Sequence, residues 1–128
     1  MRRHLPLLVL LGTLAVSAGP VAAKTDKDAW KAARPDGKPI SCIPLTQIQQ
    51  SRVRDDQTID FYMGGKKVYR NTLPNSCPQL GFEKRFAYKT SLSQLCSTDI
   101  ITVLVEPGIS RGASCGLGQF QPVTGAGR

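Results

Sequence analysis

The chain has 128 residues and carries 17 lysines and arginines against 9 aspartates and glutamates, a formal net charge of +8. Its only histidine, His4, lies in an N-terminal segment that we expect to be removed. The mature chain would then contain no histidine, which excludes Ser-His-Asp and Cys-His catalysis and histidine-ligated zinc or copper.

Residues 1–23 have the pattern of a Sec-type signal peptide. Two arginines precede an apolar run from Leu5 to Ala18, and small residues close the segment at Ala23. The apolar run is shorter than the roughly 20 residues that a transmembrane helix needs. We therefore expect cleavage after Ala23, a periplasmic or secreted protein, and no transmembrane segment in the 105 residues that remain.

The mature chain divides into three parts. Residues 24–41 are polar and interrupted by proline and glycine, which predicts a flexible leader, with docking of Trp30 on the domain as the alternative. Residues 42–123 are expected to form a single β domain. Residues 124–128 are rich in glycine and alanine and are expected to form a disordered tail.

A β-hairpin is the clearest element of the domain. Apolar residues alternate with mostly polar ones from Thr58 to Met63, the period of a strand with one buried face. Two glycines begin the turn that follows, and glycine readily adopts the positive φ angles of tight turns. The return strand is expected from Lys67 to Leu73, where Pro74 ends it.

The length of the turn decides the register of this hairpin. A three-residue turn, Gly64 to Lys66, places Tyr69 opposite Phe61 and the oppositely charged Arg70 opposite Asp60. A two-residue turn would shift the pairing by one residue and reverse the faces. We therefore expect the three-residue turn.

Later elements are also short strands. Phe86 and Tyr88 predict a third strand, with Phe82 anchoring its approach. The apolar run Ile100–Val105 predicts a strand buried on both sides, and Phe120 with Val123 predicts a last short strand. The fold class expected is all-β, a small disulfide-braced antiparallel barrel or sandwich of five or six short strands.

Four cysteines, Cys42, Cys77, Cys96 and Cys115, predict two disulfides in an exported chain. Three connectivities are open, and we favour Cys42 with Cys77 and Cys96 with Cys115. The spacing contains no C-x-x-C pair, which argues against a four-thiolate zinc site and a thioredoxin-like redox site. We therefore expect neither a metal nor another cofactor.

A series of short motifs runs from Cys42 to Val123: Cys42-Ile43-Pro44-Leu45, Val53-Arg54-Asp55-Asp56-Gln57-Thr58-Ile59, Val68-Tyr69-Arg70-Asn71-Thr72-Leu73, Asn75-Ser76-Cys77-Pro78, Gly81-Phe82, Arg85-Phe86-Ala87-Tyr88, Leu95-Cys96 and Cys115-Gly116-Leu117-Gly118. In this order the motifs resemble a family of small exported proteins of Gram-negative bacteria that carry a cysteine-containing domain of unknown function. The resemblance supports the fold and the location, and it implies no activity and no site.

Asp55, Asp56 and Asp60 are the only carboxylate cluster in the sequence. Such a cluster can serve acid–base chemistry or bind calcium. Paired aspartates before a strand are also common in turns, and Asp60 has Arg70 as a partner across the hairpin. We favour the structural interpretation, and a small hydrolase using these three residues is the alternative.

Basic residues suggest a second kind of site. Lys66, Lys67, Arg70, Lys84 and Arg85 would bind anionic envelope polymers weakly if they formed one contiguous face. Lysines on strand edges also simply deter edge pairing, and an exported protein is not expected to be a dedicated nucleic-acid binder. The function predicted is a non-enzymatic periplasmic binding or structural module, with an envelope protein or an anionic envelope polymer as partner.

Overall fold

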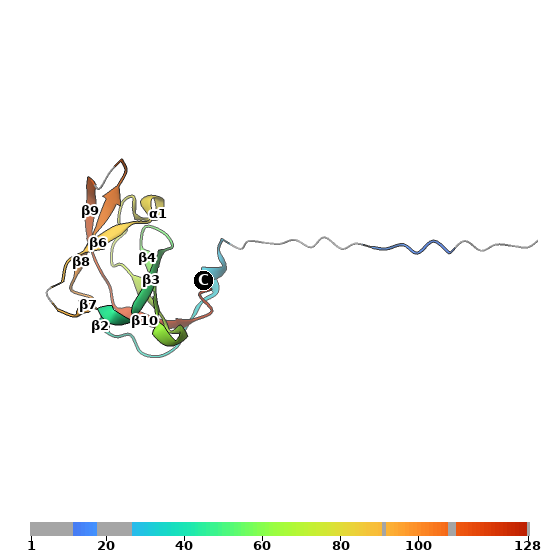
Figure 1. Cartoon of the computed structure of the whole chain (residues 1–128), viewed down its shortest axis with the longest axis horizontal. Helices are drawn as coiled ribbons and strands as arrows, with labels where there is room; N and C mark the ends of the chain where they lie inside the picture. Colours follow the sequence, from blue (N-terminus) through green and yellow to red (C-terminus); the bar gives the residue numbers. More distant parts are fainter. Residues whose placement is uncertain (1–11, 18–26, 91, 108–109, 128) are drawn as a thin grey trace, which may run out of the picture.

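The computed structural model describes residues 12–17, 27–90, 92–107 and 110–127. The cleavage point after Ala23 and most of the predicted signal peptide lie outside these ranges, and residues 12–17 are exposed without regular secondary structure (Figure 1). Within the described ranges, no helix has the length and apolar character needed to cross a membrane.

Short antiparallel strands form three sheets (Figure 1). The five-stranded sheet has the order β1 (Arg34–Pro35), β10 (Phe120–Thr124), β5 (Val68–Thr72), β4 (Thr58–Met63) and β3 (Ile48–Val53). The two-stranded sheet pairs β2 (Cys42–Pro44) with β7 (Gln94–Cys96), and the three-stranded sheet has the order β6 (Phe86–Tyr88), β8 (Ile100–Val105) and β9 (Ser110–Gly116).

Helical segments are few and short in the described residues: η1 (Ala29–Ala32), η2 (Leu45–Gln47), η3 (Gly64–Lys66) and α1 (Leu80–Glu83). The all-β, antiparallel, disulfide-braced fold is therefore confirmed. The described chain has ten strands where five or six were expected. The additional strands are β3 and β9, of six and seven residues, and the two- or three-residue strands β1, β2 and β7.

The central hairpin, β4 and β5, has the predicted register. Phe61 lies opposite Tyr69 and Asp60 opposite Arg70. The turn is the three-residue segment η3, in which Gly65 and Lys66 have φ angles of 73° and 65°. Two successive positive φ angles are the backbone feature for which glycine is favoured.

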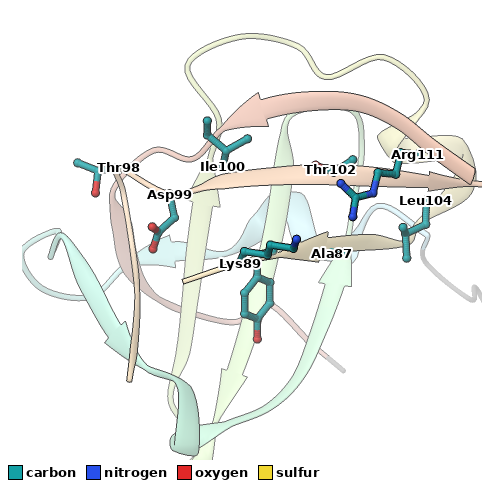
Figure 2. A pocket seen from close by; sticks show the side chains of 9 residues that line it. Ala87, Lys89, Thr98, Asp99, Ile100, Thr102, Leu104 and Arg111 are labelled. Atoms are coloured by element: carbon teal, nitrogen blue, oxygen red, sulfur yellow. The ribbon is translucent and has the colours of Figure 1, made fainter. Parts of the chain in front are cut away.

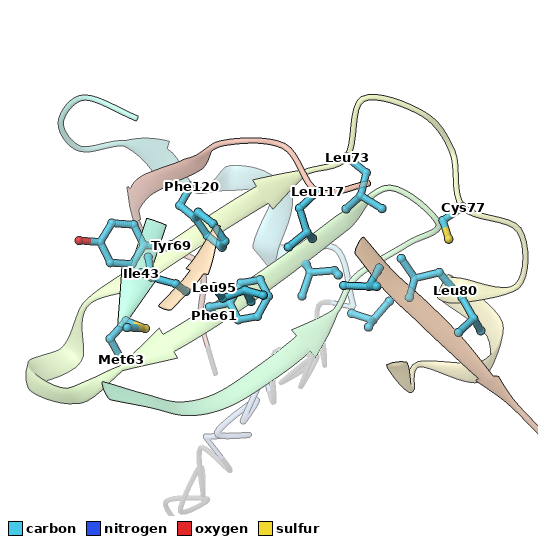
Figure 3. Close-up of a cluster of buried hydrophobic side chains, with 14 residues drawn as sticks. Ile43, Phe61, Met63, Tyr69, Leu73, Cys77, Leu80, Leu95, Leu117 and Phe120 are labelled. Atoms are coloured by element: carbon cyan, nitrogen blue, oxygen red, sulfur yellow. The ribbon is translucent and has the colours of Figure 1, made fainter. Parts of the chain in front are cut away.

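One apolar core lies between the three sheets (Figure 3). Phe61 of β4 packs edge-on against Phe120 of β10, with ring centroids 5.6 Å apart, and against Phe86 of β6, at 6.3 Å. Ile43 of β2 and Leu95 of β7 add fully buried side chains from the small sheet. The Phe61 ring is therefore one of the core contacts that join the five-stranded sheet to the three-stranded sheet.

Strand β8 is buried on one face, which corrects the prediction that both faces are covered. Ile101 and Val103 are fully buried, whereas Ile100 is 57% exposed. The three-stranded sheet packs on the core with one side only, so alternate residues of β8 face outward. Phe82 was also wrongly expected to anchor the chain: on the short helix α1 it is 85% exposed.

The disulfides join Cys42 to Cys96 and Cys77 to Cys115, so the expected pairing was wrong. Strands β2 and β7 pair directly and place Cys42 opposite Cys96. Cys77 is held near the β3–β4 turn by its backbone N–H, which donates to the Asp56 carbonyl at 2.7 Å. Sequence distance favoured the local pairs, but strand pairing brings the distant cysteines together.

Residues on both sides of 42–123 pack on the domain where the structure describes them, although a flexible leader and a disordered tail were expected there. Strand β1 pairs with β10, and Ile40 forms a further bridge with Phe120. At the other end, Ala126 is buried. The folded unit thus extends beyond the predicted limits of residues 42–123 in both directions.

Asn71 and Gly118 form a second point of close packing. The Asn71 side-chain amide donates to the Gly118 carbonyl at 2.7 Å and accepts from the Gly118 N–H at 2.8 Å. A Cβ atom on Gly118 would lie 2.2 Å from the Thr72 carbonyl oxygen. Glycine is therefore required sterically at this position.

We expect Cys77→Ser/Cys115→Ser to retain the other disulfide and to lower the free energy of unfolding by about 2–5 kcal/mol, because a 38-residue separation is no longer closed. Urea denaturation and thiol labelling measure the two effects. The matched variant Cys42→Ser/Cys77→Ser should instead leave two labelled thiols. If that variant forms a disulfide in good yield, the observed connectivity is wrong.

We expect Gly118→Ala to destabilise the protein by about 1–3 kcal/mol or more, because the new methyl group collides with backbone that cannot move away easily. Gly116→Ala is the matched control, since a Cβ atom there meets nothing within 4 Å. Thermal unfolding of both variants measures the difference. Equal melting temperatures would contradict the close approach.

Candidate binding groove

The predicted carboxylate cluster is divided among three structural roles. Asp55 accepts a hydrogen bond from the Gln57 N–H at 2.8 Å, which closes the turn before β4. Asp56 accepts from the Gly81 N–H at 2.7 Å and so fixes α1 to the same turn. Asp60 lies within β4 with no exposed surface. The favoured structural interpretation of Asp55 and Asp56 agrees with these contacts.

Asp60 sits between two arginines on the side of the five-stranded sheet that faces away from the core. Arg70 donates to its two carboxylate oxygens at 2.7 and 2.9 Å, and Arg54 donates to one of them at 2.9 Å. The predicted Asp60–Arg70 pair is therefore confirmed. Arg54 is a partner that sequence reasoning missed, because it lies beyond the end of β3.

The two arginines also bind backbone carbonyls near both ends of the described domain. Arg70 donates to the Trp30 carbonyl at 2.8 Å and its guanidinium lies 5.2 Å from the centroid of the Trp30 ring. Arg54 donates to the Tyr62 hydroxyl at 2.6 Å and to the Ala126 carbonyl at 3.1 Å. The docking of Trp30, which was the alternative to a flexible leader, is thus observed.

The basic residues do not form the contiguous face that polymer binding would need. Lys66 and Lys67 lie at the turn between β4 and β5, whereas Lys84 and Arg85 follow α1, which is bonded to the opposite end of β4 (Figure 1). The length of β4 separates the two groups by roughly 17 Å at ~3.3 Å per residue. Arg85 is further paired with Glu106 at 3.0 Å.

A hollow of about 470 Å³ lies between this turn and the chain end at residues 125–127. Lys67 lies at its edge with its ammonium 5.1 Å from the Tyr69 ring centroid, and a side-chain hydrogen bond with Tyr69 raises the pKa of Lys67. Lys67 therefore remains cationic. Among the described residues, none of the exposed large apolar side chains lines this hollow.

The outer face of the three-stranded sheet carries a more distinctive site, a groove of about 370 Å³ that we name the β8 groove (Figure 2). Its floor is the outward-facing row of β8, Ile100, Thr102 and Leu104, and Ala87 of β6 lies beside Thr102. The Thr102 and Ser114 hydroxyls lie 3.1 Å apart across β8 and β9. Ala87 and Ser114, the small residues on either side of Thr102, leave the groove open between Ile100 and Leu104.

Charged side chains rim the β8 groove. Lys89 approaches from the end of β6 and Arg111 from β9, and Figure 2 shows both reaching over the sheet. Asp99 lies at the Ile100 end, where one carboxylate oxygen accepts from the Cys96 N–H at 2.7 Å. The groove therefore combines exposed apolar surface with two cations and one carboxylate that is engaged in a turn.

Sequence reasoning did not find this groove. β8 was interpreted as buried on both sides, which concealed its outward row. The only available signal was the threonine at position 102, which interrupts the apolar run at a position alternating with Ile101 and Val103. Arg111 carried no signal, because no strand was expected over Ser110–Gly116, the residues that form β9.

Within the described residues, no group of histidine, cysteine, aspartate or glutamate side chains could hold a metal ion. Comparisons with protein-family models, with curated proteins and with solved structures found no match. Function is therefore inferred from the contacts and grooves of the chain itself.

We expect Asp60→Asn to lower the free energy of unfolding by about 3–5 kcal/mol, because it leaves two largely buried arginines without their carboxylate. Asp55→Asn is the control: the amide oxygen can still accept from Gln57, and a change within ~0.5 kcal/mol is expected. Denaturation followed by fluorescence of Trp30, the only tryptophan, measures both. Equal stabilities would contradict the role of Asp60.

Proposed function

We propose that this protein is exported by its N-terminal signal peptide and acts in the periplasm or outside the cell as a non-enzymatic binding module. The signal-peptide pattern and two disulfides support the location, since disulfides persist in oxidising compartments. Membership of the family of small exported Gram-negative proteins, suggested by the motif order, belongs to the same proposal.

The β8 groove carries the binding part of the proposal. It leaves Ile100 57% exposed, although most large apolar side chains of the described domain are buried. Ligand-binding sites are typically concave and combine apolar surface with a few convergent polar groups. The groove therefore supports recognition of another molecule by the outer face of the three-stranded sheet.

The contacts of the aspartates favour binding over hydrolysis. An acid–base site needs carboxylates that converge on a substrate and remain free to exchange protons. Asp60 is enclosed by two arginines, while Asp55 and Asp56 accept backbone hydrogen bonds in a turn. None of these three aspartates lines the β8 groove or the hollow beside Lys67.

We expect the full-length chain, expressed in a Gram-negative host, to be recovered from the envelope with Lys24 as its first residue. Its intact mass should be four hydrogens below that of the reduced chain, because two disulfides have formed. Mass spectrometry before and after reduction measures both properties. An uncut chain with four free thiols would remove the basis for export.

The groove itself is tested by filling it. We expect Ala87→Tyr to abolish cosedimentation of the exported protein with a Gram-negative envelope fraction, because the added ring covers the floor beside Thr102. Gln50→Tyr on the exposed side of edge strand β3 is the matched control and should bind like the parent protein. The groove is rejected as the binding site if Ala87→Tyr still binds the envelope fraction, or if Gln50→Tyr loses binding as well.

A further inference from the structure

Two cations converge over the middle of the β8 groove. The backbone of Lys89, the residue after β6, lies beside Ile100, and Arg111 of β9 is paired with Leu104. The charged ends of the two side chains point toward one another above β8 (Figure 2). Both side chains are exposed. Neither forms an ion pair with any residue that the structure describes. The arrangement is therefore available to one anionic group.

Apolar side chains stand at both ends of this cationic centre. Ile100 and Leu104 are four residues apart on one face of β8, which places them about 13 Å from one another at ~3.3 Å per residue. Thr102 lies midway between them. The pattern along the groove is thus apolar, cationic, apolar, with the spacing of alternate residues in an extended chain.

Accepting the proposed binding function, we infer that the β8 groove takes an extended acidic segment of an envelope protein. The segment carries an acidic residue with apolar residues two positions before and two positions after it. In an extended chain these three side chains point the same way. The apolar pair then covers Ile100 and Leu104 while the carboxylate lies between Lys89 and Arg111.

The order of groups along the groove decides against other anions. A fatty acid or phospholipid carries its anionic head at one end of its apolar body, but here the cations lie between two apolar ends. An anionic polysaccharide offers Ile100 and Leu104 only the C–H faces of its rings and no apolar side chains. A peptide supplies both kinds of side chain at the required spacing, so charge and apolar complementarity together favour it.

Asp99 helps to position the acidic residue. Its carboxylate lies at the Ile100 end of the groove and is fixed by the Cys96 N–H at 2.7 Å. Like charges close together repel, so an acidic side chain is disfavoured beside Ile100 and favoured at the centre. The groove therefore discriminates the position of the negative charge as well as its presence.

The test uses the exported, oxidised, isotopically labelled protein and the capped peptide Leu-Ser-Glu-Ser-Leu, followed by amide chemical shifts. Shifts should map to β6, β8 and β9. Replacing Glu by Gln, or moving it in Leu-Glu-Ser-Ser-Leu, should weaken binding about two- to fivefold, the effect of a lost surface charge pair. Binding should also weaken as salt rises.

Protein variants locate the charge contact. Lys89→Ala and Arg111→Ala should each weaken binding of the Glu peptide about two- to fivefold and leave the Gln peptide unaffected. Lys38→Ala removes the same charge from an exposed position between β1 and β2 and should change neither. All three positions are exposed, and melting temperatures equal to that of the parent protein verify folding.

The inference is overturned if the Glu and Gln peptides bind equally, if the moved charge binds as well, or if Lys38→Ala has the same effect as Lys89→Ala. Binding to anionic lipid vesicles without binding to the peptide would overturn it in favour of a lipid surface. Each of these results leaves the proposed function standing if Ala87→Tyr still abolishes envelope binding. If Ala87→Tyr binds the envelope fraction like the parent protein, the proposed function itself is rejected.

Discussion

The buried ion cluster of Asp60, Arg54 and Arg70 is the constraint on which the rest of the molecule depends. β4 is buried along its whole length, so an aspartate at its centre loses its water on folding. Such a group is tolerated only when opposite charges and hydrogen bonds replace the lost water. The arginines do so and then use their remaining N–H groups on the Trp30 and Ala126 carbonyls. One carboxylate thereby orders two segments that are far apart in the sequence.

How far the sequence predicts this fold depends on whether the deciding contact is local. The register of β4 and β5 was predictable, because a three-residue turn and period-two burial determine it. The disulfide pairing was not, because Cys42 meets Cys96 only after β2 pairs with β7. The docking of the leader and tail on the domain was also not predictable. Polar and glycine-rich segments indicate flexibility, and only the folded structure shows that a distant arginine binds their backbone.

The groove failed to appear in the sequence for a different reason. A run such as Ile100–Val105 reads as a doubly buried strand, because hydropathy records what a residue prefers and not what covers it. Ile100 is exposed since no segment in the described ranges packs on that side of the three-stranded sheet. Lys89 and Arg111 become neighbours of this strip only through the pairing of β6 and β9 with β8. Cross-strand proximity of this kind has no signal along the chain.

The two larger sheets differ in how their outer faces are covered. Each sheet has one face on the shared core, and its other face is either covered by another segment of the chain or exposed to water. The ends of the described domain cover the five-stranded sheet through the arginine contacts, and they are then not free to cover the other sheet. On the three-stranded sheet, Gly116 and Ser114 lie beside the β8 row and leave it open. The Cys77–Cys115 bridge ties β9 covalently to the loop after β5, so this open face has a covalent brace in place of a covering layer. A face kept in shape by a covalent bond, and not by its own burial, is one that can bind and release a partner without unfolding.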